Sequence, residues 1–439
     1  MYNIFYGIHI SIMNLSLEQQ LAFDEFNLGN NIFITGPGGS GKTELIRQIF
    51  KSTKRRIQVC ALTGCAAILL ECKAKTIHSW AGIGIANGTV EEVVAKCTSN
   101  RFKMSQWTKT DVLIIDEVSM MSQKIFDILN LIGKKMRKND KPFGGIHLIF
   151  SGDFYQLPPI GSDEASSAFC FESEDWASTF ESIIKLKTIF RQTDQTYSTI
   201  LNQIREGVLY KSGVDKLNEH LNKPLPCDAS FKPTILMSRR KDVDAINCEE
   251  MGKLSDESKV VYTLKKVILD KWSKQSSEKQ DENEHKSLIN NIIADNEIVL
   301  KKGAQVMCIS NIDMESEHPI VNGSQGIVVD FVGGLPMVKF NGGSCPRIMS
   351  YHTWISENNS CIAVMQVPLV LAWAITIHKS QGCTLDMAQI DVGSGIFECG
   401  QTYVALSRVK NLDGLFLTAF DPYKIKVNKK VQAFYNKLK

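Results

Sequence analysis

Short runs of apolar and β-branched residues recur along the first half of the chain. Residues 31–35, 57–62, 112–115 and 146–151 show no regular apolar–polar alternation, which is typical of strands buried on both faces of a sheet. The stretch Glu44–Phe50, shortly after the first run, has a helical pattern. Strands that alternate with helices in this way predict a parallel sheet covered by helices, and therefore an α/β fold.

Weaker patterns in the second half predict a second α/β domain. Strands are expected at Thr234–Met237, Gln389–Val392 and Leu415–Ala419, and helices near Asp242–Met251 and at Thr402–Ser407. The chain is long enough for two such domains, because domains commonly have roughly 100–200 residues.

Two stretches interrupt the second domain. Residues 311–361 are rich in glycine and alternate apolar with polar residues, notably at Gly326–Val332 and Met337–Phe340, which predicts a small β-barrel. Residues 271–288 are polar and predict a surface linker or an insertion.

Composition narrows the class of protein. The chain has 439 residues, of which 44% are hydrophobic and 22% charged, which excludes a disordered chain, a collagen and a coiled-coil rod. No apolar run approaches the roughly 18 residues that cross a membrane. Because 50 Lys and Arg nearly balance 47 Asp and Glu, the net charge is only +3, and a polyanionic partner would have to meet local positive charge.

The 12 cysteines include no Cys-x-x-Cys pair, and most stand in apolar runs, as Cys60 and Cys308 do. We therefore expect buried free thiols and an intracellular, reducing compartment. Nucleus, cytoplasm and a viral replication site are not distinguished by this argument. Residues 1–13 lack the basic region of a signal peptide, which is therefore not expected. They are interpreted as an extension without a role in the fold, because Met13 followed by Asn-Leu-Ser is typical of a second start. The lysine-rich tail 424–439 predicts either a solvated terminal helix or a patch for backbone phosphates.

The first predicted strand leads into Gly36-Pro-Gly-Gly-Ser-Gly-Lys42-Thr43, and a helix follows. This is the phosphate-binding G-x-x-x-x-G-K-[ST] loop in the strand–loop–helix context that it requires. Glycines let the loop turn its N–H groups towards phosphate oxygens, and the helix N-terminus adds a favourable potential. Lys42 is expected to reach the terminal phosphates of ATP, and the Thr43 hydroxyl to bind Mg²⁺.

Two further strands end in residues suited to nucleotide hydrolysis. Asp116 follows residues 112–115 and would hold Mg²⁺, while Glu117 would act as the general base for the attacking water. The strand at 146–151 leads to Gln156, whose amide could sense the γ-phosphate. The sequence so far predicts a P-loop nucleotide hydrolase, without showing what work the hydrolysis drives.

Four longer motifs connect the chain to a known family. They are Lys141–Pro159, Thr76–Gly84, with Trp80 in place of the usual Phe, His378–Thr384 and Tyr403–Arg408. With them the chain resembles the petite-integration-frequency DNA helicases, a branch of the 5′-to-3′ helicases of superfamily 1, over about residues 14–420. The resemblance implies two RecA-like motor domains that bind ATP and Mg²⁺ between them.

The resemblance also implies domain boundaries. The first motor would span residues 14–190, with an insertion at 85–109. The second would comprise 191–310 and 362–439, interrupted by an SH3-like element at 311–361. The insertion at 85–109 contains Arg101, Phe102, Lys103 and Trp107 and would form either a wedge that separates strands or a plain surface excursion.

The resemblance assigns nucleotide-binding roles residue by residue. Gln19 would contact the base, Gly382 would approach the γ-phosphate, and Gln156 would couple the γ-phosphate to the DNA side. Arg191 and Arg408 would be supplied from the second motor, where a planar guanidinium suits the charge of the transition state. The phosphate loop would consist of Gly36, Pro37, Gly38, Gly39, Ser40, Gly41, Lys42 and Thr43.

The residues implied to contact DNA fall into two groups. Trp80 and Phe154 are either stacking platforms for bases or packing residues. The polar and basic candidates are Thr63, His78, His378, Lys379 and Thr384.

The resulting hypothesis is a DNA helicase that translocates 5′-to-3′ on single strands and unwinds forked or tailed duplexes. G-quadruplexes and RNA–DNA hybrids are further candidate substrates, no membrane is expected, and the free protein is expected to be monomeric. One alternative is a DNA-stimulated ATPase that remodels complexes without processive unwinding. Another is a P-loop switch or kinase without a motor. An RNA substrate also stays open, and so does the pathway among replication, recombination, repair and telomere maintenance.

Overall fold

The strands expected in the first half form one parallel sheet in the computed structural model. The sheet has the order β3-β2-β4-β5-β1-β6, so β1 lies between β5 and β6. β3 and β6 complete the sheet beyond the four predicted strands. The bounds are β1 Ile32–Thr35, β2 Ile57–Ala61, β3 Lys75–Thr76, β4 Val112–Asp116, β5 His147–Gly152 and β6 Ser182–Lys185. The structure describes residues 15–438 apart from 71, 85, 87, 162, 226–231, 270–277, 293, 313–319, 342, 344, 357, 358 and 360.

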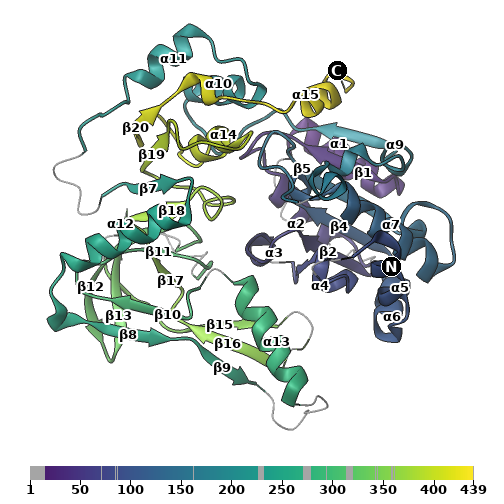
Figure 1. Ribbon diagram of the computed structural model, residues 1–439, viewed down its shortest axis with the longest axis horizontal. Helices are drawn as coiled ribbons and strands as arrows, with labels where there is room; N and C mark the ends of the chain where they lie inside the picture. Colours follow the sequence, from purple (N-terminus) through teal and green to yellow (C-terminus); the bar gives the residue numbers. More distant parts are fainter. Residues whose placement is uncertain are drawn as a thin grey trace, which may run out of the picture.

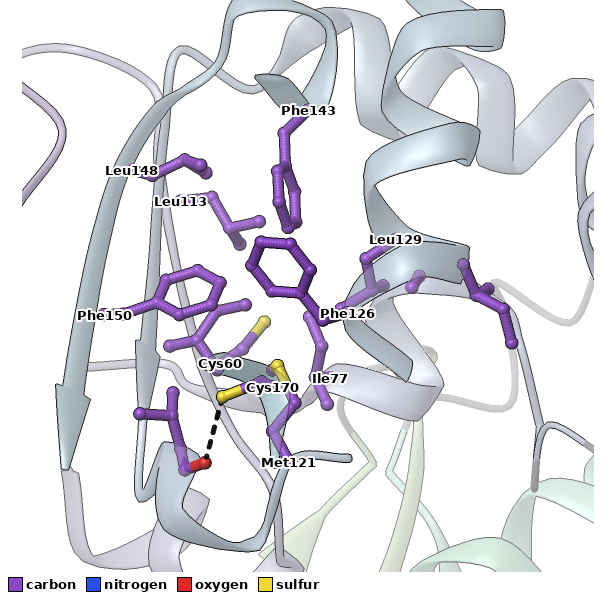
Figure 2. Close-up of a cluster of buried hydrophobic side chains, with 14 of the residues drawn as sticks. Cys60, Ile77, Leu113, Met121, Phe126, Leu129, Phe143, Leu148, Phe150 and Cys170 are labelled. Atoms are coloured by element: carbon purple, nitrogen blue, oxygen red, sulfur yellow. Dashed lines mark hydrogen bonds between the residues drawn. The ribbon is translucent and has the colours of Figure 1, made fainter. Parts of the chain in front are cut away.

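Side chains of this sheet alternate between two cores, which explains the continuous apolar runs. On β4, Leu113 and Ile115 face one core, whereas Val112 and Ile114 face the other. The first core is rich in aromatic rings, and Figure 2 shows Phe126, Phe143 and Phe150 packed together in it. The centroid of the Phe126 ring lies 5.3 Å from that of Phe143 and 6.0 Å from that of Phe150.

Helices cover both faces of the sheet (Figure 1). Their positions follow the cores: α7 supplies Phe126 to the aromatic core, while α1 and α2 supply Phe26 and Leu45 to the opposite core. Their bounds are α1 Leu17–Leu28, α2 Lys42–Ser52, α3 Gly64–Leu70, α4 Ile77–Ala81, α5 Val90–Thr98, α6 Arg101–Lys109, α7 Gln123–Arg137, α8 Glu164–Ser167 and α9 Trp176–Thr179.

The second half contains a smaller parallel sheet with the order β18-β7-β19-β20. The three strands predicted for this domain are present, and β18 is added to them. A separate core lies on this sheet and on α10 and α14. The bounds are β7 Thr234–Met237, β18 Ala374–Thr376, β19 Ala388–Val392, β20 Leu415–Phe420, α10 Gln195–Glu206, α11 Lys211–Asn218, α12 Arg240–Gly252 and α14 Gln401–Leu406.

An antiparallel accessory region is larger than the predicted 311–361. Its strands form sheets of two, five and three strands, which begin before and end after that range, so the predicted boundaries were too narrow. Backbone pairing between distant segments caused the difference: β11, for example, pairs with both β12 and β17. The bounds are β8 Val260–Thr263, β9 Lys265–Ile268, β10 Glu297–Leu300, β11 Gln305–Cys308, β12 Gln325–Val332, β13 Leu335–Phe340, β14 Arg347–Ile348, β15 His352–Ile355, β16 Ile362–Gln366 and β17 Leu369–Leu371.

Both other insertions contain helices. The polar stretch 271–288, predicted to be a surface linker or an insertion, includes the start of α13 (Glu278–Asn291), which packs on β16; residues 271–277 lie outside the described residues. In 85–109, α5 and α6 pack against α7. Trp107 is fully buried, and the Lys103 ammonium donates a hydrogen bond to the Ser79 carbonyl at 2.7 Å. A wedge role for this helical pair stays a prediction.

The C-terminal helix α15 (Lys429–Asn436) does not belong to the second motor, to which 362–439 was assigned. Figure 1 shows it beside α9 of the first motor, and the Phe434 ring lies 6.2 Å from that of Trp176 on α9, measured between centroids. Val431 and Tyr435 are buried in the aromatic core of the first sheet. The lysine-rich composition of this segment did not indicate its apolar face. Through this face, the C-terminal helix packs against the first motor.

The cysteines of the described residues form no disulfide, and six of them are buried: Cys60, Cys72, Cys97, Cys170, Cys308 and Cys383. Cys170 lies in the aromatic core, where its thiol donates a hydrogen bond to the Val118 carbonyl (Figure 2). Cys248 and Cys345 are exposed, contrary to the expectation of burial. Among the described residues, none of the helices has the length and apolar character needed to cross a bilayer.

Candidate nucleotide and nucleic-acid site

The phosphate loop connects β1 to α2 and is enclosed by residues from outside the first sheet. Gly39 and Gly41 have φ angles of 81° and 80°. A Cβ atom on Gly39 would lie 2.4 Å from Arg191 Cβ, and one on Gly41 would lie 2.5 Å from Gln19 Nε2. These glycines are therefore required both by the turn and by close neighbours.

Lys42 is held at the base of the loop. Its ammonium donates hydrogen bonds to the carbonyls of Gly36 and Pro37 at 2.7 and 3.0 Å. Burial lowers the pKa of Lys42, while the carboxylates of Asp153, Glu117 and Asp116 oppose this shift. The arrangement places a cation beside the phosphate loop and the carboxylates, as the motif predicts.

Asp116 and Glu117 lie at the C-terminal end of β4, which is central in the sheet. Burial raises the pKa of Asp116, and burial together with the Asp116 charge raises the pKa of Glu117 to about 7. Glu117 has a φ angle of 56°, so its backbone is in the left-handed region, which is uncommon for a residue other than glycine. Two adjacent carboxyl groups in this environment favour a bound cation.

The residues present fit a magnesium ion shared with a nucleotide. Thr43, Asp116 and Glu117 line one cavity of about 480 Å³, and their oxygens are the hard ligands that Mg²⁺ prefers. The described residues contain no group of three or more acidic, His or Cys side chains that would cage a metal. Mg²⁺ commonly takes one or two carboxylates and completes its shell with water and phosphate oxygens.

Two arginines from outside the first sheet reach the phosphate loop. A Cβ atom on Gly38 would lie 3.5 Å from Arg408 Nη2 and 3.6 Å from Arg191 Nη1. Arg408 follows α14 and is 2% exposed; burial is the main cause that lowers its pKa. Burial and the Arg408 charge lower the pKa of Arg191 to about 9. Two closely placed cations, of which Arg408 is buried and Arg191 half-buried, favour an anion between them.

Gln156 and Gly382 also lie at this junction. The Gln381 amide donates hydrogen bonds to Glu117 Oε2 at 3.2 Å and to Gln156 Oε1 at 3.5 Å. Gly382 lines the 480 Å³ cavity together with Thr43 and Arg191. The residue expected to sense the γ-phosphate is thus connected to the second motor through Gln381.

Gln19 lies against the phosphate loop rather than pointing freely into solvent. Its side-chain amide donates hydrogen bonds to the carbonyls of Ser40 and Gly41 at 3.5 and 3.4 Å. Ser16 caps α1 and holds the Gln19 side chain through its own backbone N–H. The buried Ser40 hydroxyl has no hydrogen-bond partner among the described residues, so it offers a polar atom to a ligand.

Three residues near the loop were not given roles from the sequence. The Gly38 N–H donates a 2.8 Å hydrogen bond to the Tyr403 hydroxyl, and Gln381 forms the bridge described above. Phe190 is 55% exposed although it is aromatic, and its ring lies beside Gly41 and close to Gln19. Tyr403 and Gln381 stand inside the motifs given above, yet only the fold shows which atoms each of the three residues meets.

Only some of the residues predicted to contact DNA lie together at the nucleotide cavity. Thr63, His378 and Lys379 line the cavity that also contains Thr43 and Asp116. His78 on α4 and Thr384 are not among its lining residues. Burial lowers the pKa of His78 and of His378, which favours neutral imidazoles that bind through hydrogen bonds rather than charge.

Trp80 and Phe154 are not available as stacking platforms, so that prediction was wrong. Trp80 is 0% exposed and packs on Trp107, with ring centroids 4.5 Å apart. Phe154 is 2% exposed and lies 5.3 Å from the Phe33 ring. The packing interpretation applies to both, because their neighbours in the core come from segments distant in sequence.

Comparison with known proteins agrees with this geometry. The model of the PIF1-like helicase family matches residues 14–213, and that of the 2B domain of DNA helicase Pif1 matches residues 285–331. The chain is 35% identical to the ATP-dependent DNA helicase PIF1 of Emericella nidulans, over 93% of its own length and 61% of that protein. It therefore spans about three fifths of that relative.

Solved structures extend the similarity to the whole described fold. The crystal structure of Pif1 helicase from Candida albicans is 35% identical, covers 98% of this chain with 100% of its own, and gives a TM-score of 0.77. Pif1 helicase from Bacteroides in complex with ADP-AlF3 and single-stranded DNA is 27% identical over 97% of each chain, with a TM-score of 0.66. The chain belongs to the PIF1-like helicase family.

Proposed function

We propose that this protein is an ATP-dependent DNA helicase that translocates 5′-to-3′ on single-stranded DNA and unwinds forked or tailed duplexes. The observation that carries the proposal is the position of Arg191 and Arg408, which approach Gly38 of the phosphate loop from the second motor. A nucleotide bound at this loop contacts both motors, so binding and hydrolysis can close and open the cleft between them. The direction of movement rests on family membership alone.

In this proposal, ATP lies on the phosphate loop. Lys42 contacts its terminal phosphates, and Gln19 and Phe190 contact its adenine. Mg²⁺, held by Thr43 and Asp116, would offset phosphate charge. Glu117 accepts a proton from the attacking water, for which a pKa of about 7 is suitable. Arg191 and Arg408 stabilise the charge that develops on the γ-phosphate.

The nucleic-acid strand is proposed to pass over Thr63, His378 and Lys379. These residues line the same cavity as Thr43 and Asp116, so a bound strand can influence the nucleotide directly. The Bacteroides relative was solved with both single-stranded DNA and ADP-AlF3, which supports simultaneous binding here. The exposed thiol of Cys248, which is not part of a disulfide, supports the reducing compartment expected from the sequence.

Lys42→Ala tests the proposal. We expect the wild-type protein to hydrolyse ATP faster when single-stranded DNA is added, and the variant to lose this activity while it still binds the strand. The measurement is steady-state phosphate release with and without single-stranded DNA, alongside fluorescence anisotropy of a labelled oligonucleotide. ATP hydrolysis at the wild-type rate in Lys42→Ala would refute the assignment of the site.

Unwinding assays on duplexes with a 5′ tail or a 3′ tail test whether the protein separates strands and in which direction it moves. A helicase of the proposed polarity unwinds only the 5′-tailed duplex. ATP hydrolysis and translocation without strand separation would instead support the remodelling ATPase considered above.

A further inference from the structure

The C-terminal helix α15 is attached to the first motor by its aromatic side chains. The Phe434 ring lies 4.5 Å from Phe171 and 5.4 Å from Phe154, measured between centroids. Tyr435, the next residue, is 3% exposed. The sequence motifs of the nucleotide site end well before this helix, and none of them accounts for its position.

The Tyr435 hydroxyl connects two segments that belong to the nucleotide site. It lies 2.6 Å from Thr35 Oγ1, at the end of β1 where the phosphate loop begins. It also accepts a 3.2 Å hydrogen bond from the Phe154 N–H, two residues before Gln156. One side chain from the end of the sequence therefore joins the base of the phosphate loop to the segment that carries the γ-phosphate sensor.

The same hydroxyl and ring meet a buried ion pair. The hydroxyl donates a 3.5 Å hydrogen bond to Asp153 Oδ1, and Asp153 accepts two hydrogen bonds from the Arg205 guanidinium at 2.8 and 2.7 Å. Arg205 lies on α10, whose apolar face belongs to the core of the second motor. Its guanidinium stands 4.5 Å above the Tyr155 ring and 5.5 Å from the Tyr435 ring.

The two tyrosine rings are stacked, with centroids 4.7 Å apart and planes 11° apart. Burial raises the pKa of Tyr435, so its hydroxyl is neutral and is able to donate and accept hydrogen bonds at once. Ring packing alone would need only phenylalanine at this position. The hydroxyl is the part of the side chain that reaches Thr35, Phe154 and Asp153.

We propose that Tyr435 is a positioning residue for ATP hydrolysis: its hydroxyl fixes the segment that carries Gln156 relative to the phosphate loop and to Arg205 of the second motor. The C-terminal helix then belongs to the hydrolytic machinery of the protein rather than to its surface alone. This inference rests on the proposed ATPase function of the site. Misplacement of a sensor by a fraction of an ångström lowers turnover more than binding, because the transition state is more demanding than the ground state.

The test compares Tyr435→Phe with Tyr155→Phe in the full chain. Both variants remove one hydroxyl from the same pair of stacked rings, but only the first removes the bonds to Thr35 and Phe154. We expect kcat for DNA-stimulated ATP hydrolysis to fall about three- to tenfold in Tyr435→Phe, the range that corresponds to one buried hydrogen bond, with KM for ATP within about twofold. Tyr155→Phe is expected to keep the wild-type kcat.

Hydrogen–deuterium exchange supplies a second readout that does not depend on activity. In Tyr435→Phe the Phe154 amide loses its acceptor, so peptides covering residues 153–157 should exchange faster than in the wild type and in Tyr155→Phe. Unchanged exchange together with unchanged kcat would overturn the proposal. Equal losses of kcat in both variants would also overturn it, because the stack alone would then explain the effect.

Two outcomes separate this inference from the proposed function. If the wild-type protein does not hydrolyse ATP, the proposed function fails, and exchange at 153–157 alone decides whether Tyr435 holds the segment. If Tyr435→Phe does not fold, Thr35→Val removes the hydroxyl partner at the other end of the 2.6 Å contact. That variant keeps the acceptor of the Phe154 amide but cuts the connection to the phosphate loop, so kcat should fall in the range expected for Tyr435→Phe, and a wild-type kcat would overturn the proposal.

Discussion

Arg408 is a charged side chain that is almost completely buried, and its hydrogen bonds fix its position beside the phosphate loop. Its Nε donates to the Val404 carbonyl at 2.8 Å, and its Nη2 donates to the Ser407 hydroxyl at 2.7 Å. Nη1 makes longer contacts of 3.5 and 3.4 Å with the carbonyls of Ser380 and Cys383. These bonds fix the plane of the guanidinium, while Nη2 remains close to Gly38.

Arg408→Lys should keep the charge but lose this fixed plane. We expect kcat for ATP hydrolysis to fall by about two orders of magnitude, less than the roughly 10³–10⁵ attributed to a whole arginine finger, while ATP affinity changes little. Steady-state kinetics and nucleotide-binding titrations measure the two quantities. Lys410→Ala is a suitable control, because Lys410 is 49% exposed and pairs with Asp386 at the surface. Collapse of ATP affinity with unchanged turnover of bound ATP would contradict the finger role.

At the scale of the element, α14 approaches the segment that carries Gln156 so closely that only glycine fits at the N-cap of the helix. Gly400 has a φ angle of 76°, and a Cβ atom there would lie 2.5 Å from the Tyr155 carbonyl oxygen and 2.6 Å from that of Gln156. The helix that leads to Arg408 therefore begins directly on the segment that carries Gln156. We therefore expect this contact to couple the position of α14 to that of Gln156.

Gly400→Ala should disturb both folding and catalysis. The left-handed backbone alone costs about 1–2 kcal/mol with a Cβ atom, and the clash adds to it. We expect a lower melting temperature together with a fall in kcat. Gly334→Ala is the matched control, because Gly334 has a φ angle of 77° but nothing within 4 Å of a Cβ atom. Equal effects of the two substitutions on kcat would show that the contact with the sensor segment is unimportant.

At the scale of the whole molecule, the two motors share a buried ion pair. Asp153 is 0% exposed and Arg205 3% exposed, and each comes from a different motor. A buried ion pair is weak evidence of stability, because the cost of removing both charges from water is large. Removing a single partner is more severe, since it leaves one charge without compensation.

Asp153→Ala should therefore be strongly destabilising, by about 3–5 kcal/mol, because Arg205 stays buried and loses both of its bonds to the carboxylate. The double variant Asp153→Ala/Arg205→Ala should be less destabilised than the sum of the single variants. Chemical denaturation of the four proteins gives the coupling free energy of the pair. Additive effects would show that the pair does not hold the motors together.

The sequence by itself determined the strands and the chemistry at their ends. Local patterns were sufficient for the four central strands, the phosphate loop, Asp116 and Glu117, because period and motif depend on neighbouring residues. Resemblance added the distant residues Arg191 and Arg408, which no spacing could have placed at the same nucleotide. The structure brings both arginines to Gly38.

The tertiary structure decided what each side chain touches. Trp80 and Phe154 stand within the family motifs but are core residues, because rings from distant segments cover them. The accessory sheets begin before and end after their predicted range, since their strands pair across long separations. The place of Tyr435 depends on a chain that returns after 400 residues to Thr35, and a contact of that kind has no local signal in the sequence.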